Sequence, residues 1–173
     1  MKLRSASSSW ALPLACALAL ASTLATAACD RKNETPTVVS AVAANADKPG
    51  SDGSYVVTTA TVGDCKAGET CTATLRIEAQ SEFHINDEYP YKFTAGDASG
   101  VEYQGTDGSG KNVFSKAAGN FAKTSAKVGV LTVKLKPASK GTVNVAGVYR
   151  LSVCSDATCK LDNPTVSFAI DAK

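Results

Sequence analysis

The feature that most constrains the fold is an alternation of apolar and polar residues that recurs from about residue 54 to the end. Segments such as YVVTTATV at 55–62 and VGVLTVKLK at 128–136 show it clearly and are rich in Val and Thr. A period of two is typical of strands that bury one face, and β-branched residues favour strands. No segment there has the spacing of an amphipathic helix. The alternation therefore predicts an all-β domain.

About seven strands are expected, separated by clusters of Gly, Asp, Asn, Ser and Pro. The expected strands lie within 55–62, 70–79, 91–95, 112–117, 128–136, 142–153 and 165–171. Short strands at this spacing predict an immunoglobulin-like antiparallel β-sandwich over residues 54–173. The apolar residues of 128–135 and 143–153 are expected to face one core. The core Trp that marks antibody domains is not expected in this domain, because the only tryptophan of the sequence, Trp10, lies in the N-terminal segment before it.

The N-terminal segment has the layout of a secretory signal peptide over residues 1–28. Lys2 and Arg4 precede an apolar run that ends in small residues. The sequence TAAC at 26–29 resembles the lipobox of bacterial lipoproteins, which predicts lipidation of Cys29. Cleavage by ordinary signal peptidase after Ala27 or Ala28 and a retained anchor helix are the alternatives.

The predicted lipoprotein would sit on the periplasmic side of a membrane in the bacterial cell envelope. Asp30 after the lipidated cysteine would keep it at the inner membrane, if the enterobacterial sorting rule applies. Residues 29–53 are small and polar and predict a flexible tether.

The charge balance of the mature chain argues against nucleic acid as a partner. Of the 18 Lys and Arg residues, Lys2 and Arg4 belong to the signal, which leaves 16 against 16 acidic residues. A neutral chain offers no electrostatic attraction for nucleic acid. The membrane is therefore expected to be reached through the lipid and not through a basic surface.

The cysteines predict two local disulfides. Of the six, Cys16 is expected to leave with the signal and Cys29 to be lipidated, and the remaining four are Cys65, Cys71, Cys154 and Cys159. An even set in an exported chain favours disulfides. Local pairing is favoured because each pair brackets a turn, and opposed hairpin residues are close enough to be bridged. A zinc ion held by all four cysteines is the alternative.

Two segments, SEFHINDEYPYKF at 81–93 and GVYRLSVCSDATCKLDNPTVSFAI at 147–170, resemble the N-terminal periplasmic domain of the thiol:disulfide interchange protein DsbD. The resemblance covers about residues 55–171. It implies an immunoglobulin-like sandwich whose hairpin cysteines, Cys154 and Cys159 here, pass reducing equivalents between a membrane thiol oxidoreductase and thioredoxin-like proteins. The residues KLDNP after Cys159 and the extra pair Cys65 and Cys71 depart from the family pattern.

The implied chemistry is thiolate attack on a disulfide, which needs an accessible sulfur. Lys160 is expected to favour a thiolate at Cys159, whereas Asp156 and Asp162 would oppose it. Cys65–Cys71 is expected to be structural. Two functions stay open: thiol–disulfide exchange through Cys154 and Cys159, or a non-enzymatic binding or adhesion module in which both disulfides are structural.

Three other patterns are interpreted as structural. GTDGSGKN at 105–112 nearly matches the phosphate-binding loop, but Asn112 replaces the required Ser or Thr and a strand follows, so a turn is expected. His84 is the only histidine, which argues against a histidine-based metal site or catalytic triad. The segment NDE at 86–88 is expected to be a solvated turn and not an acid/base pair, since nothing indicates burial. No cofactor or metal is predicted.

Overall fold

The computed structural model describes residues 48–50 and 52–173, which fall in one compact unit of twelve strands and no helix. The predictions for the signal peptide, Cys16, Cys29, Asp30 and most of the tether lie outside the described residues. Within the described part, no helix is long and apolar enough to cross a membrane.

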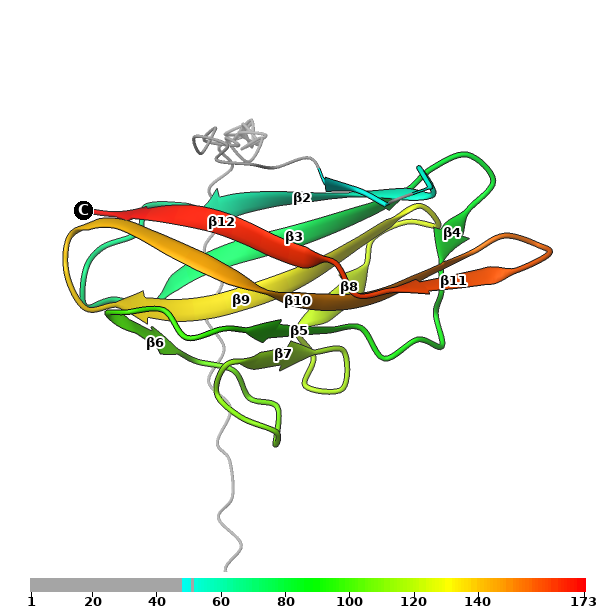
Figure 1. Ribbon diagram of the computed structural model, residues 1–173. Helices are drawn as coiled ribbons and strands as arrows, with labels where there is room; N and C mark the ends of the chain where they lie inside the picture. Colours follow the sequence, from blue (N-terminus) through cyan, green and yellow to red (C-terminus); the bar gives the residue numbers. More distant parts are fainter. Residues whose placement is uncertain (1–47, 51) are drawn as a thin grey trace, which may run out of the picture. The chain divides into compact units, whose positions relative to one another are not determined.

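The first sheet has six antiparallel strands (Figure 1). Its order is β1 (Lys48–Pro49), β2 (Tyr55–Val62), β3 (Cys71–Ala79), β9 (Val128–Pro137) and β6 (Val101–Tyr103), with β8 (Phe121–Lys123) also on β9. Strand β1 belongs to the segment that the sequence assigns to the tether. The folded part of the chain therefore begins before residue 54.

The second sheet is built around one long central strand, β10 (Gly141–Cys154). On one side β10 pairs with β11 (Cys159–Asp162) and β12 (Thr165–Ala172). On its other side it pairs with β4 (His84–Ile85) and β5 (Lys92–Ala95), and β5 pairs with β7 (Val113–Ser115). The two sheets together form the predicted immunoglobulin-like β-sandwich.

The core forms where the inward faces of the two sheets meet. Buried residues alternate with more exposed ones along β3, β9 and β12, as the sequence pattern predicts. Both predicted core segments are confirmed: the fully buried residues include Leu131, Val133 and Leu135 of β9 and Val145, Tyr149, Leu151 and Val153 of β10. Burial of these apolar side chains supplies the main stabilising free energy of the domain.

The last two strands form one continuous edge. The register runs from Cys154↔Cys159 to Leu151↔Asp162 and resumes without a bulge at Val148↔Thr165. Between them the Tyr149 amide donates to the Pro164 carbonyl at 2.9 Å. Strands β11 and β12 therefore act as a single edge strand interrupted only at Asn163 and Pro164.

Candidate functional site at the hairpin end of the sandwich

The β10–β11 hairpin carries the cysteine pair that the sequence singles out. It extends from one end of the sandwich (Figure 1). Cys154 and Cys159 are directly opposed across the two strands and form a disulfide, with a Cα–Cα distance of 4.0 Å. The turn is closed by the Ser155 amide, which donates to the Thr158 carbonyl at 2.8 Å, so the predicted local pairing on a hairpin is confirmed.

The two sulfurs differ in their surroundings. Leu151 and Val153 of β10 face the core, so Cys154 lies on the outer face of the sheet. Neighbouring segments nevertheless shield Cys154, which is only 6% exposed, whereas Cys159 is exposed. Leu161, two residues further along β11, lies on the same outer face and is 66% exposed.

His84 lies beside this disulfide, which sequence analysis did not anticipate. In the register of β4 and β10, His84 is directly opposite Cys154. Opposed residues of an antiparallel pair point to the same face. His84, Cys154 and Cys159 therefore form a row across β4, β10 and β11, and the half-buried His84 is a neighbour of the disulfide.

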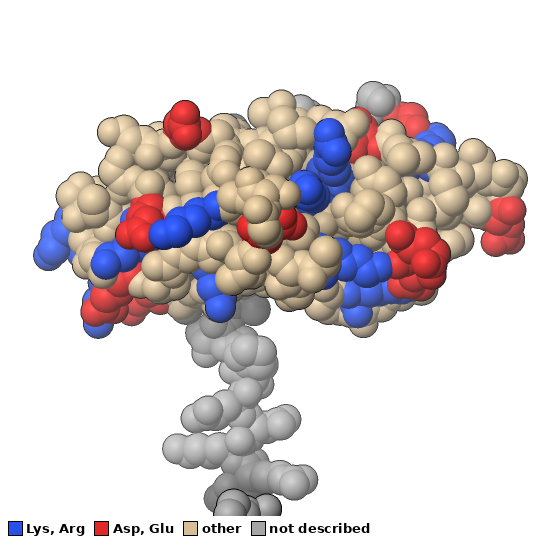
Figure 2. Space-filling model, turned by 90° about the horizontal axis from the view of Figure 1, so that it is seen from below, with Lys and Arg blue, Asp and Glu red and all other residues tan. Residues whose placement is uncertain are grey.

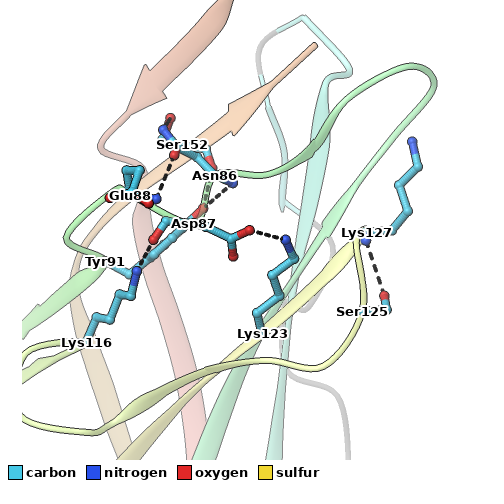
Figure 3. A network of polar contacts seen from close by, with 9 residues as sticks. All are labelled: Asn86, Asp87, Glu88, Tyr91, Lys116, Lys123, Ser125, Lys127 and Ser152. Atoms are coloured by element: carbon cyan, nitrogen blue, oxygen red, sulfur yellow. Dashed lines mark hydrogen bonds and ion pairs between the residues drawn. The ribbon is translucent and has the colours of Figure 1, made fainter. Parts of the chain in front are cut away.

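The segment after His84 is held by a polar network (Figure 3). The Asn86 side-chain amide donates to the Ser152 hydroxyl at 3.3 Å, and the Tyr91 hydroxyl donates to the Ser152 carbonyl at 2.5 Å. Lys123 forms an ion pair with Asp87 at 2.6 Å. This hydrogen-bonded contact holds the pKa of the Asp87 carboxyl below its ordinary value. Within this network, Asn86 contacts the outer face of β10 at Ser152, two residues before Cys154.

Lysines also anchor this segment through its backbone. The Lys116 ammonium donates to the Asp87 carbonyl, and the Lys127 ammonium donates to the carbonyls of Ser81 and Phe83 at 2.5 Å each. Asp87 and its neighbour Glu88 are exposed, in agreement with a solvated turn. These contacts fix the position of β4, and therefore of His84, against β10.

A cleft of about 310 Å³ lies beside β11. It is lined by Asp52, Ser54, Tyr55, Lys160, Leu161 and Asp162. Lys160 forms an ion pair with Asp52, and its ammonium lies 4.8 Å from the centre of the Phe83 ring. The hydrogen bond from Lys160 lowers the pKa of the Asp52 carboxyl well below its ordinary value.

The position of Lys160 corrects one expectation. Lys160 is opposite Val153, so its side chain points to the inward face of the sheet, away from that of Cys159. Its ammonium is engaged with Asp52 and Phe83. Alternation along the strand therefore directs the charge away from the side on which Cys159 lies, and the expected support of a Cys159 thiolate by Lys160 is wrong.

The second disulfide, Cys65–Cys71, has a different setting. Both cysteines are buried at 3% exposure, and their Cα atoms are 5.1 Å apart. The enclosed loop holds the end of the chain, because the Lys173 amide donates to the Cys65 carbonyl at 2.9 Å and the Ala67 amide donates to the Lys173 carbonyl at 3.2 Å. These contacts support the structural role predicted for this pair.

The remaining sequence patterns form no site in the described part of the chain. Residues 105–112 form a turn in which Asp107 accepts from the Ser109 amide at 2.9 Å, and strand β7 follows at once. Among residues 48–50 and 52–173, no group of three or more His, Cys, Asp or Glu side chains could hold a metal ion. Basic and acidic side chains are interspersed on the face shown in Figure 2.

Comparison with known proteins places this chain in no family. No family model matches the chain. No curated protein matches it either. Two solved structures are similar at low TM-scores. AggA, the major subunit of aggregative adherence fimbriae type I from Escherichia coli, is 7% identical, with 69% of this chain and 95% of that chain covered and a TM-score of 0.33. A PapD-like domain of human CEP192 is 14% identical, with 78% and 95% covered and a TM-score of 0.29.

These similarities are too weak to assign a function. Neither structure is a DsbD domain. The resemblance to DsbD is thus supported only at the level of the immunoglobulin-like sandwich, which rests on the two sheets of this chain.

Proposed function

We propose that this chain is a non-enzymatic β-sandwich binding module of the bacterial cell envelope. Its binding surface is the hairpin end, defined as the cleft residues Asp52, Ser54, Tyr55, Lys160, Leu161 and Asp162 together with the turn 155–158. The observation that carries the proposal is Leu161, which is 66% exposed on an open edge strand and lines the cleft.

The hairpin end combines features that favour protein recognition. An exposed apolar side chain beside a cleft with polar walls resembles the apolar centre and polar rim of an interface. The disulfide and the ion pair between Lys160 and Asp52 tie β11 to its surroundings. A surface that is ordered before binding loses less conformational entropy when a partner docks.

The envelope location is part of the same proposal. The signal-like residues 1–28, the TAAC sequence and Cys29 support export and a lipid anchor. The two disulfides, Cys65–Cys71 and Cys154–Cys159, also favour an oxidising compartment.

Site-specific photo-crosslinking of the full chain in bacterial envelopes tests the binding surface. A benzophenone amino acid at position 161 is expected to give a discrete crosslinked product. The same probe at Val62, which is 56% exposed on β2, is the matched control and is expected to give none. Absence of a product at 161, or equal products at both positions, would exclude the hairpin end as the binding surface.

Thiol–disulfide exchange is a second candidate, favoured by the exposure of Cys159 and the position of His84 next to Cys154. In the reduced hairpin, the Cys159 thiolate would attack a disulfide of a thioredoxin-like or membrane oxidoreductase, which releases one partner thiolate and forms a mixed disulfide. The Cys154 thiolate would then attack the Cys159 sulfur, restore the hairpin disulfide and release the second partner thiol.

Trapping and redox titration separate the two candidates. If exchange occurs, Cys154→Ser is expected to trap the mixed disulfide at Cys159, and the double variant Cys154→Ser/Cys159→Ser is expected to trap nothing. The Cys154–Cys159 potential should then lie above about −300 mV, the approximate limit for structural disulfides. A potential below that limit, with nothing trapped, would leave the hairpin disulfide as a structural element of a binding module.

A further inference from the structure

Strand β11 is an open sheet edge. It pairs with β10 on one side, and no strand in the described part of the chain pairs with its other side. An open edge presents backbone groups that can pair with another strand.

The hydrogen-bonding pattern shows which residues present those groups. The amides of Tyr149 and Ser155 donate to the carbonyls of Pro164 and Thr158 at 2.9 and 2.8 Å, so these positions are hydrogen-bonded pairs. Such pairs alternate with non-hydrogen-bonded ones, in which the Cα atoms are closer, and Cys154 and Cys159 at 4.0 Å fit the second type. By the same alternation, the amide and carbonyl groups of Cys159 and Leu161 point away from β10, to the open edge.

The sequence of the edge is complementary to itself. Lys160, Leu161 and Asp162 place a base and an acid on either side of a leucine. If a second β11 approaches antiparallel with Leu161 opposite Leu161, each Lys160 stands opposite an Asp162. Directly opposed residues of opposite charge stabilise an antiparallel pair, and like charges destabilise it.

We propose that β11 pairs antiparallel with β11 of a second copy of this chain, about a two-fold axis at Leu161. The two leucines exchange their outward-pointing amide and carbonyl hydrogen bonds, and their exposed side chains pack side by side on the outer face. This inference rests on the proposed binding function of the hairpin end and names its partner as the chain itself.

Charge favours a second copy over an unrelated strand. Lysines on edge strands commonly prevent unwanted pairing, because an incoming apolar or basic strand leaves the ammonium unmatched. A second copy instead offers Asp162 in register. Lys160 stays 38% exposed while paired with Asp52, and Asp162 stays half-buried while it accepts from Tyr55. An ammonium has three donors and a carboxylate accepts several bonds, so each group keeps capacity for a second partner.

Two charge-reversed variants of the full chain test the pairing. Lys160→Asp leaves two acids on each edge and Asp162→Lys leaves two bases. Each variant alone is therefore expected to self-associate about tenfold more weakly than the wild type, measured by sedimentation velocity. An equimolar mixture of the two is expected to form a heterodimer, because acids then face bases. Lys134→Asp, on an exposed position of β9, is the matched control and is expected to behave as wild type.

The outcomes distinguish this inference from the proposed function. Restored association in the mixture shows that both variants are folded and that the charges face each other. If the wild type is monomeric at all concentrations, or if the mixture stays monomeric while the wild type associates, the self-pairing is wrong. In that case a position-161 crosslink to a different protein would retain the binding function, and no crosslink would reject both.

Discussion

The hydroxyl of Tyr55 donates a hydrogen bond to the Asp162 carboxylate at 2.5 Å, across 107 positions of sequence. Tyr55 begins β2 of the first sheet and Asp162 ends β11 of the second. The bond therefore ties the hairpin end to the opposite sheet. Burial raises the pKa of the Tyr55 hydroxyl, and the hydrogen bond to Asp162 raises it further.

Removal of this hydrogen bond should destabilise the domain. Tyr55→Phe keeps the buried ring and removes the donor to Asp162 Oδ2, while the Asn163 amide still donates to Oδ1. We expect a loss of about 1–2 kcal/mol, since hydrogen bonds to charged groups contribute at this level and partial exposure reduces the effect. Chemical denaturation would measure it as a lower midpoint with an unchanged slope. An unchanged midpoint would mean that water replaces the bond without cost.

The hydroxyl of Tyr149 should be dispensable. It is buried, and no hydrogen-bond partner for it exists within the described residues. A buried polar group without a partner costs about 1–3 kcal/mol, so Tyr149→Phe is expected to leave stability unchanged or raise it. Tyr91→Phe is the matched comparison, because the Tyr91 hydroxyl bonds to Ser152 and Asn86, and it should lower the melting temperature. A clear loss of stability in Tyr149→Phe would point to an internal partner such as a bound water.

Gly147 should not tolerate a side chain. A Cβ atom at this position would lie 2.4 Å from the Thr94 carbonyl oxygen and 2.6 Å from the Phe93 ring. The first of these is backbone in the neighbouring strand and cannot move freely. Gly147→Ala is therefore expected to cost about 1–3 kcal/mol, as overpacking does in cores. Gly108→Ala, at a position with open space around it, is the control and should be nearly neutral in the same thermal melt.

The two disulfides should contribute unequally to stability. Each closes a short loop, which the chain-entropy model values at about 2 kcal/mol. Cys65–Cys71 is also buried and organises the loop that binds the end of the chain at Lys173. The double variant Cys65→Ala/Cys71→Ala should therefore lose more stability than Cys154→Ala/Cys159→Ala. Equal losses of unfolding free energy in urea denaturation would contradict this ranking of the two disulfides.

Acid stability should depend on Asp107. The hydrogen bond from the Ser115 hydroxyl, with others from Ser109, lowers the pKa of Asp107 from 3.8 to about 2. A carboxyl with a lowered pKa stabilises the folded state above its ordinary pKa, and this contribution is lost as the pH falls through the folded value. As the pH falls from 3.8 to about 2, wild type should therefore lose more stability than Asp107→Asn. Ser115→Ala should also lose less stability than wild type over this pH range. Parallel curves of stability against pH for all three proteins would contradict the role given to Asp107.

Much of the architecture follows from the sequence by itself. Alternation at period two predicts the long strands, because a strand with one buried face needs an apolar residue at every second position. The local cysteine pairs are predicted for a different reason: each pair brackets a turn, which brings its two cysteines close together. The short strands β1, β4, β6, β8 and β11 were not among the expected strands, whereas the equally short β5 and β7 were found because they lie within the apolar segments 91–95 and 112–117.

The relationships within the hairpin end were decided only by the tertiary structure. His84 stands opposite Cys154 because the long strand β10 pairs with segments drawn from residues 84 to 172. Tyr55 reaches Asp162 because the start of β2 in the first sheet lies beside the end of β11 in the second. Such pairings depend on register between distant segments, and a shift of one residue would turn every side chain to the opposite face. Lys160 illustrates the consequence: it is adjacent to Cys159 in sequence, yet the pleat of β11 directs it to Asp52 on the inward face. The sequence thus determined which residues form strands, and register determined which of them meet.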